Sequence, residues 1–254
     1  MSEPNLLRGL VRKLQGHSEL APGDCDAILA LPHTVRTLDS GAYLVREGDQ
    51  PRYCCVLVSG FAMRHKVTGD GQRQILSIHM AGDFVDLHNV YLETSDHNVQ
   101  ALSRAEVAFL PRSAVSELAA GRPLVARALW TDTLVDAAIF REWVVNVGRR
   151  TSIARIAHLL CEVALRMEAA GLARDGVYQM PMTQEQIADA AGLTPVHVNR
   201  VLKELGRLGL IVRDKRSVSI PDWERLRHIG DFSARYLHIG RDAPFPHEAV
   251  SRAA

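Results

Sequence analysis

The sequence predicts an α+β protein in three parts: an antiparallel β-roll of the jelly-roll type, a long helix, and a winged helix-turn-helix. Three observations lead to this order. Short β-type runs separated by turn residues fill roughly 33–110, an apolar segment without internal proline or glycine covers 124–147, and two helical patterns meet at Gly192 ahead of an apolar-basic-apolar segment. At 254 residues, 47% of them hydrophobic, the chain is long enough for two domains.

The N-terminal part is expected to combine two short helices with the β-roll over 1–120. "NLLRGLVRKL" is amphipathic, and "APGDCDAILALP" predicts a second helix after a Pro-Gly turn. The strand signals are "SGAYLVREGDQP", "CCVLVSG", "AMRHKVTGDGQRQILSIHMAGDF" and "NVQALSRAEVAFLP". Short strands at this spacing are typical of a sandwich, a jelly roll or a closed roll.

A central helix is predicted over 121–148. Its apolar residues cover more of the circumference than one packing face requires, so two partners are expected. One is the β-roll, and the other is the same helix of a second subunit, although Asp132 and Asp136 interrupt the heptad pattern. The alternative is a helix buried within one chain.

A hinge is expected at Gly148–Ser152, where Gly148 can end the long helix and Thr151 or Ser152 can cap the next. A second domain over 149–235 follows, with a tail over 236–254. It begins with the helix "IARIAHLLCEVALRMEAAG" and the short strand "VYQMPM", and it closes with the helix "WERLRHIGDF".

The helix-turn-helix is predicted from local chemistry. Thr183 and Gln186 form a capping box, and Gly192 permits the positive φ of a tight turn. Thr194 caps a second helix, and Pro195 takes its first position, where a missing N–H costs little. The segment "IVRDKRSVSIPD" then suits a β-hairpin.

The second helix has two faces of different character. Its inner face is the apolar set Val198, Val201, Leu202 and Leu205. From Leu193 to Arg216 the chain carries six Lys and Arg against two acidic residues, which leaves +4, although the whole chain has a net charge of only +1. The basic patch indicates double-stranded DNA as the partner.

Individual contacts with DNA follow from side-chain chemistry. Arg200 suits the O6 and N7 of a guanine, Asn199 an adenine, and Val196 a thymine methyl group. Phosphate contacts carry no sequence information, and they suit the remaining polar and basic positions. The candidate DNA-binding residues are Thr183, Gln184, Thr194, Pro195, Val196, His197, Asn199, Arg200, Lys203, Lys215 and Arg216.

The cysteine pattern and the hydropathy of the sequence indicate where the protein works. The four cysteines include no CxxC motif, which predicts reduced structural thiols rather than disulfides or a zinc site. Cys54 and Cys55 should point to opposite faces of a strand, and no redox role is expected for the exposed one. No signal-peptide pattern begins the chain, and no window approaches the roughly 18 apolar residues of a membrane span. We therefore expect a cytoplasmic protein without a membrane partner.

The motifs "REGDQPRYCCVLVSG", "QILSIHMAGDF", "RIAHLLCEVA", "TQEQIADAAGLT" and "VNRVLKELGRLGLI" resemble those of the cyclic-AMP receptor protein and fumarate-nitrate reductase regulator (CRP/FNR) superfamily of bacterial transcription regulators. The resemblance covers roughly residues 30–222. It implies a β-roll of the cyclic-nucleotide-binding type, a homodimer joined through the long helix, and two recognition helices in successive major grooves of a pseudo-palindromic site. It further implies an effector that acts through the hinge, and contact with RNA polymerase if the protein is an activator.

Cyclic AMP is not the expected effector. Asp86 and Leu87 stand where cyclic-nucleotide-binding members carry Gly-Glu for the ribose, and Ser95 and Asp96 where they carry Arg-Ser for the phosphate. Phe140 and Arg141 occupy the positions on the long helix that would meet the adenine. These six residues form the candidate effector pocket, and a carboxylate facing a phosphodiester repels it.

No cofactor, metal ligand or catalytic residue is assigned. The chain lacks the N-terminal cysteines of iron–sulfur members, while His65, His79, His88 and His97 leave haem or metal formally open. Metal-dependent β-roll enzymes need histidines and a carboxylate that converge, usually with an H-x-H pair, and no such pair is present. Two alternatives to an effector-tuned regulator remain: an effector-independent regulator of the same fold, and a haem- or metal-binding β-roll sensor or enzyme.

Overall fold

The computed structural model describes residues 5–174 and 176–239. Contacts divide the chain into two compact units, residues 1–137 and 138–254, and the division falls inside the long helix. The three-part domain boundaries drawn from the sequence therefore remain predictions. Of the expected tail over 236–254, residues 240–254 lie outside the described part of the chain.

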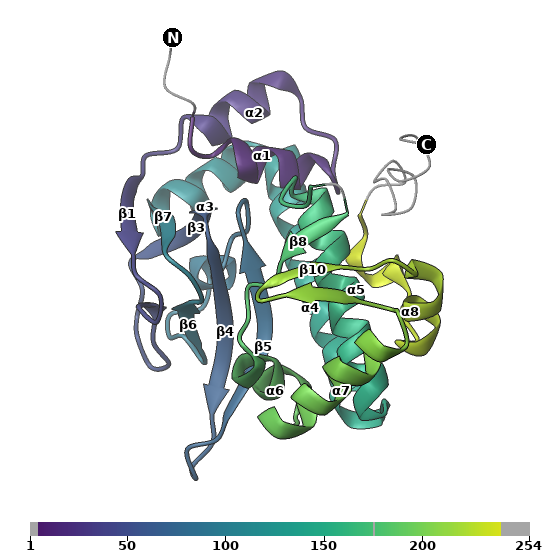
Figure 1. Cartoon of the computed structure of the whole chain (residues 1–254). Helices are drawn as coiled ribbons and strands as arrows, with labels where there is room; N and C mark the ends of the chain where they lie inside the picture. The colour runs from purple at the N-terminus through teal and green to yellow at the C-terminus, as the bar shows by residue number, and fades with distance from the viewer. Residues whose placement is uncertain (1–4, 175, 240–254) are drawn as a thin grey trace. The chain divides into compact units, whose positions relative to one another are not determined.

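The first unit contains the predicted pair of helices and the β-roll (Figure 1). The helices are α1 (Arg8–Gln15) and α2 (Pro22–Leu29). The strands are β1 (Thr34–Leu38), β2 (Tyr43–Val45), β3 (Tyr53–Ser59), β4 (Phe61–Val67), β5 (Arg73–Met80), β6 (Asn98–Ala101) and β7 (Ala105–Pro111), with the 3-10 helix η1 (Leu87–Val90) between β5 and β6.

These strands form two antiparallel sheets. One has the order β1-β7-β3 and the other β2-β6-β4-β5. The turn after β5 adds further pairing to β3, because Leu57 donates to the carbonyl of Asp83 and Val85 donates to that of Cys55, both at 3.0 Å. This turn fixes the start of the segment that leads into η1.

Helix α1 packs closely on the turn after β5. A Cβ on Gly82, whose φ is +97°, would lie 2.8 Å from the carbonyl oxygen of Gly9, so a side chain at position 82 would force the helix and the turn apart. Lys13 on the same helix forms ion pairs with Asp83 at 3.0 Å and Asp132 at 2.8 Å. The short N-terminal helix is thus a fixed part of the first unit.

Helices α3 (Arg112–Gly121) and α4 (Pro123–Arg149) follow the roll. The expectation that Gly148 ends the long helix is wrong, since α4 runs through it to Arg149. Gly148 keeps a negative φ, and nothing lies within 4 Å of a Cβ built there, so helical geometry costs it little. The break falls at Arg150 and Thr151 instead, and the Thr151 side chain caps α5 as predicted.

The second unit begins within α4 and contains the helix-turn-helix. Its further elements are α5 (Ser152–Ala169), β8 (Val177–Gln179), α6 (Gln184–Ala191), α7 (Pro195–Arg207), β9 (Val212–Asp214), β10 (Ser217–Ser219), α8 (Trp223–Ile229) and the 3-10 helix η2 (Ala234–Leu237). The strands form one antiparallel sheet of order β8-β10-β9. Among the described residues, none of the helices combines the length and hydropathy that crossing a bilayer demands.

A buried polar network ties the core of the second unit together. Trp143 of α4 donates through Nε1 to the Glu162 carboxylate at 3.0 and 3.1 Å, and Tyr236 donates its hydroxyl to the same carboxylate at 2.7 Å. Glu162 is fully buried, so these donors stabilise a charge that would otherwise be costly in the core. The end of α4 is thereby held to α5.

The cysteines are free thiols in the structure. Neither Cys54 nor Cys55 is exposed, in contrast to the expectation that one of the pair faces solvent. Burial, followed by the nearby Asp86 carboxylate, raises the pKa of both thiols. A raised pKa disfavours the reactive thiolate, which fits the predicted structural role.

Candidate nucleic-acid interface

The helix-turn-helix begins with the predicted capping box. The Thr183 hydroxyl accepts a hydrogen bond from the Gln186 amide at 3.2 Å, and the Gln186 side chain accepts one from the Thr183 amide at 2.8 Å. Both donors belong to the first turn of α6, where backbone N–H groups have no intrahelical partner. Helix α6 therefore starts at a position fixed by its own sequence.

The turn between α6 and α7 is left-handed at Gly192, with φ 61° and ψ 45°. The Leu193 amide closes the turn by donating to the Ala188 carbonyl at 3.0 Å. Thr194 then caps α7 by accepting from the His197 amide at 3.3 Å, and Pro195 occupies the first helical position. Each local prediction for this turn is confirmed.

Two residues of α5 that the sequence analysis missed support the helix-turn-helix. Arg155 donates to the Ala191 carbonyl at 3.0 Å, at the C-terminal end of α6 where carbonyl groups lack helical partners. Ser152 lies 2.9 Å, oxygen to nitrogen, from Nε2 of His197. Neither contact has a local sequence signal, because the partners are 36 and 45 residues apart.

Helix α7 buries one face and exposes the other. Val198, Val201, Leu202 and Leu205 are buried, as predicted. On the opposite face Val196 is 82% exposed, and the side chains of Arg200 and Lys203 are exposed beside it. A large aliphatic side chain left in water at the start of a helix is available for contact with a partner.

The predicted base-reading side chains are held by neighbours. Asn199 donates its amide to the Gln184 side chain of α6 at 3.0 Å. Nη2 of Arg200 lies 3.0 Å from Nε2 of His197, one helical turn earlier. These bonds reduce the number of rotamers available to both side chains before any partner binds.

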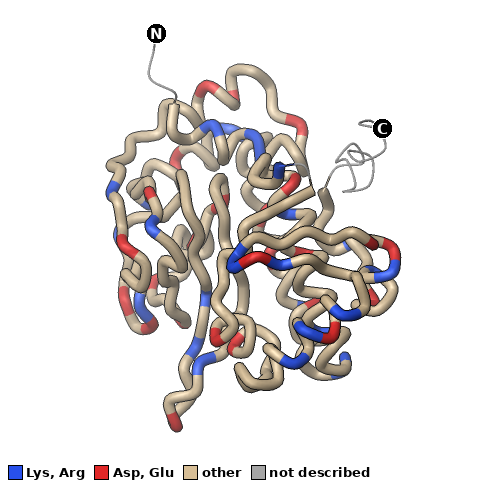
Figure 2. Tube along the Cα trace, viewed as in Figure 1, with Lys and Arg blue, Asp and Glu red and all other residues tan. Residues whose placement is uncertain are grey.

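The β9–β10 hairpin, here called the wing, carries exposed basic residues at its tip. Lys215 adopts a left-handed φ of 53°, and Arg216 follows it. Both are exposed, as is Arg213 on β9. Lys and Arg gather along α7 and at the tip of the wing in Figure 2. Within α7, Arg207 is paired with Glu204 at 2.8 Å, so this acidic residue is neutralised locally.

The predicted effector residues of the first unit are mostly buried. Asp86 accepts a hydrogen bond from the Cys55 amide at 2.6 Å, and burial raises the pKa of its carboxyl to about 6. Ser95 donates its hydroxyl to the His97 carbonyl at 2.9 Å, whereas the Asp96 side chain is 79% exposed. Leu87 packs against the apolar core of this unit.

The remaining two candidates, Phe140 and Arg141, belong to the second unit. Phe140 is half-buried and Arg141 is exposed. Their part in an effector pocket remains a prediction.

The first unit holds a cation that the sequence analysis overlooked. Arg64 on β4 is buried, donates to the Val85 carbonyl at 2.8 Å and pairs with Asp136 at 2.7 Å.

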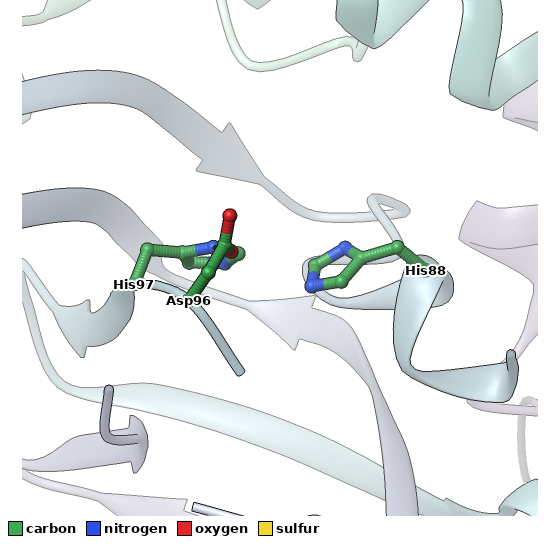
Figure 3. Close-up of side chains that lie close together, drawn as sticks. All are labelled: His88, Asp96 and His97. Atoms are coloured by element: carbon green, nitrogen blue, oxygen red, sulfur yellow. Dashed lines mark hydrogen bonds and ion pairs between the residues drawn. The ribbon is translucent and has the colours of Figure 1, made fainter. Parts of the chain in front are cut away.

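Histidines and a carboxylate do converge in the β-roll, contrary to the sequence expectation. His88 of η1 faces Asp96 and His97, which precede β6 (Figure 3). Their candidate ligand atoms all lie within 4.8 Å of one another. Burial, followed by the positive charge of Arg64, lowers the pKa of both imidazoles to about 4, so both rings are neutral at pH 7.

Comparison with known proteins agrees with this architecture. A family model described as a cyclic nucleotide-binding domain matches residues 35–122, and one described as a Crp-like helix-turn-helix domain matches residues 154–229. The chain is 30% identical over 195 residues to the transcriptional activator protein FnrL of Cereibacter sphaeroides, which covers 75% of this chain and 78% of FnrL.

Two further proteins show the same similarity. The chain is 27% identical over 195 residues to a "Probable transcriptional activator" of Rhizobium leguminosarum bv. viciae, covering 76% of this chain and 80% of that protein. The solved structure of FixK2 from Bradyrhizobium japonicum superposes with a TM-score of 0.73 at 26% identity, over 78% of this chain and 98% of that one.

A β-roll followed by a long helix and a winged helix-turn-helix with a basic outer face defines a DNA-binding transcription regulator. The chain belongs to the CRP/FNR superfamily of such regulators. The resemblance stated from the sequence motifs is thereby confirmed, as is the predicted fold class.

Proposed function

We propose that this regulator binds DNA as a homodimer joined through α4. Trp130, Leu134 and Val144 are 64%, 51% and 68% exposed. They fall on the heptad-like series 130, 134, 137, 141 and 144, whose steps of four and three residues keep a single seam along a helix. Three large apolar side chains exposed on one seam are typical of a helix that pairs with a second copy of itself.

Apolar surface beside the seam extends this contact. Tyr91 and Leu92, which follow η1, are exposed and line the same groove as Trp130. The groove also takes in Ala126 and Thr133 of α4, so it continues the surface of the helix itself. A partner helix laid on the seam would cover this patch as well, which favours a second copy of the chain as the partner.

Each subunit then offers one recognition helix to the major groove. In a two-fold dimer the two α7 helices would enter successive grooves about 34 Å apart on a pseudo-palindromic site. Arg200 is the proposed reader of a guanine, Asn199 of an adenine and Val196 of a thymine methyl group. Thr183, Gln184, Thr194, Pro195, His197, Lys203, Lys215 and Arg216 would contact the backbone and fix the register.

Regulation by an effector other than cyclic AMP is part of the proposal. Ser95 and the exposed Asp96 stand where cyclic-nucleotide-binding relatives carry Arg-Ser for the cyclic phosphate, so the cation is replaced by Ser95 and the adjacent Asp96 carboxylate disfavours a phosphodiester. The effector would change how the Gly148–Ser152 segment holds the second unit. The effector-independent alternative predicts the same affinity for DNA before and after small molecules are removed from the purified protein.

The setting of this activity follows from the family. We expect the protein to work in the cytoplasm on chromosomal DNA, to act by binding rather than by catalysis, and to contact RNA polymerase wherever it activates.

The outward face of α7, with exposed Val196 and with Arg200 and Asn199 held by neighbours, is the observation that carries the proposal. In vitro selection of DNA bound by the full-length protein tests it. The expected product is a pair of inverted half-sites with centres one helical turn apart, about 10 base pairs. Enrichment of no sequence, or of a single half-site bound by a monomer, would contradict it.

A further inference from the structure

We propose that His88 and His97 bind a divalent transition-metal ion in the β-roll, with Asp96 orienting His97, and that this ion is the effector of the regulator. The metal site stands on its own geometry, whereas its role as effector depends on the proposed function. Zn²⁺ is the probe of choice, because imidazole ligands suit zinc and related transition metals better than Mg²⁺ or Ca²⁺.

The two imidazoles offer nitrogen atoms that have no other use in the structure. Nε2 of His88 and Nε2 of His97 are both buried, and within the described part of the chain neither has a hydrogen-bond partner. His97 as a whole is more than nine-tenths buried. Buried polar atoms without a partner are rare, because each carries the full cost of its lost hydration. A metal ion would satisfy both nitrogens at once.

Asp96 prepares His97 for this role. Nδ1 of His97 and Oδ1 of Asp96 lie 2.6 Å apart. An imidazole that gives its Nδ1 proton to a carboxylate presents an unprotonated Nε2, which is the arrangement found around metal-binding histidines. The Asp96 carboxylate also lies within 4.8 Å of the candidate ligand atom of His88, so it can add negative charge to the site. The two imidazoles leave the remaining positions of a tetrahedral ion for water or small anions.

The charges around the site leave room for a divalent cation. The positive charge of Arg64 acts on both imidazoles and opposes an incoming cation, but its guanidinium is paired with Asp136 at 2.7 Å. The Asp96 carboxylate, 2.6 Å from Nδ1 of His97, adds a negative charge of its own. Arg64, Asp136 and Asp96 together therefore leave one negative charge beside the proposed ion.

Metal binding would cross-link two parts of the roll. His88 belongs to η1 and His97 precedes β6, so one ion bonded to both imidazoles would tie these two segments together. His88 and Leu87 of η1 line the same groove as Trp130 of α4, so the cross-link would fix one wall of the groove beside the proposed dimer helix.

Calorimetric titration of chelator-treated, full-length protein with Zn²⁺ tests the site. The expected result is about one Zn²⁺ per chain, with affinity lowered roughly 10- to 100-fold in Asp96→Asn and saturable binding lost in His88→Gln. Asp96→Asn keeps the shape of an exposed side chain, and the amide oxygen can still accept a hydrogen bond from Nδ1 of His97, so the thermal unfolding of the metal-free protein should change little. His33→Gln, elsewhere in the same unit, is the matched control and should bind as the wild type does.

Visible absorption of the Co²⁺-loaded protein gives an independent readout, since imidazole ligation at a tetrahedral site produces bands that hydrated Co²⁺ lacks. Wild type and His33→Gln should show these bands, and His88→Gln should not. If the wild type binds Zn²⁺ no more tightly than the double variant His88→Gln/Asp96→Asn, the metal site is disproved.

The effector role is tested by DNA affinity with and without Zn²⁺. Wild type is expected to change its affinity for a selected operator at least tenfold on metal binding, while Asp96→Asn changes far less at the same Zn²⁺ concentration. Metal binding with unchanged DNA affinity would overturn the effector role and keep the site. Absence of sequence-specific DNA binding in any state would instead contradict the proposed function, and the titration would still report on the site.

Discussion

Nη2 of Arg200 lies 3.0 Å from Nε2 of His197, and the same nitrogen of His197 lies 2.9 Å from the Ser152 hydroxyl oxygen. The proposed base-reading arginine is thus linked, through one imidazole, to the first residue of α5. This chain of contacts joins the hinge segment to the face of the recognition helix. The proposed shift in the hinge would therefore have a path to Arg200 that leaves the helix-turn-helix folded.

Replacing His197 should loosen Arg200 without removing it. In His197→Phe a ring is kept but its nitrogens are lost, and one hydrogen bond of about 1 kcal/mol no longer orients the guanidinium. Discrimination at the base read by Arg200 should fall by roughly fivefold, as measured by competition between the best operator and one changed at that position. Discrimination equal to that of the wild type would show that the 3.0 Å contact does not orient Arg200.

The turn glycine offers a stability test with an internal control. Gly192 has a φ of 61°, where an alanine costs about 1–2 kcal/mol, although a Cβ there would meet no atom closer than 3.7 Å. Gly206 lies inside α7, where a Cβ would meet the Ile211 carbonyl oxygen at an ordinary contact distance of 3.9 Å, so Gly206→Ala should stabilise the protein by about 0.4–1 kcal/mol. Denaturant unfolding of both variants should therefore give shifts of opposite sign. Shifts of the same sign would contradict this account of the turn.

Dimerisation through α4 is tested by charge on the seam. Leu134→Glu places a carboxylate where two copies of the helix are proposed to meet, and the dimer should dissociate at micromolar concentration. Leu124→Glu adds the same charge to an exposed leucine of α4 that lies off the seam. Sedimentation analysis should show monomers for the first variant and dimers for the second. Two dimeric variants would place the interface elsewhere.

The second unit should lose stability in mild acid. Burial, followed by the Arg150 charge, lowers the pKa of His158, although the Glu162 and Glu142 carboxylates oppose the shift. Because the folded pKa lies below the ordinary value of about 6.5, the stabilising effect of a neutral His158 is complete above that pH and is lost as the pH falls below it. The unfolding free energy of wild type should drop more between roughly pH 7.5 and 5.5 than that of His158→Gln. Parallel pH profiles would rule out His158 as the cause.

Features set by neighbouring residues were predictable from the sequence. The Thr183 and Thr194 caps, the left-handed Gly192 and the buried face of α7 all depend on contacts within about one helical turn, and each is confirmed. The end of α4 was not predictable in this way. Glycine permits a helix to end but does not require it, and α4 continues through Gly148 to Arg149.

The β-roll cluster shows where sequence reasoning stopped. His88 and His97 are separated by a turn and a loop, and only the path of the chain between η1 and β6 brings them face to face. A search for an H-x-H pair overlooks such a set. The burial of Arg64 was similarly hidden, because its partner Asp136 lies 72 residues away on the long helix. Arg64 follows Met63 and precedes His65 and Lys66 on β4, so no apolar run around it marked its burial.

The most direct test of the central claim compares the DNA preferences of two variants, Arg200→Ala and Lys215→Ala. In vitro selection with Arg200→Ala should relax the preference at one position of each half-site, at a cost of about 1–3 kcal/mol there, while the other positions stay unchanged. Lys215→Ala, at the tip of the wing, should weaken binding evenly across sequences and lower its salt dependence. An even loss from Arg200→Ala, with every base preference intact, would contradict the assignment of α7 as the helix that reads the DNA sequence.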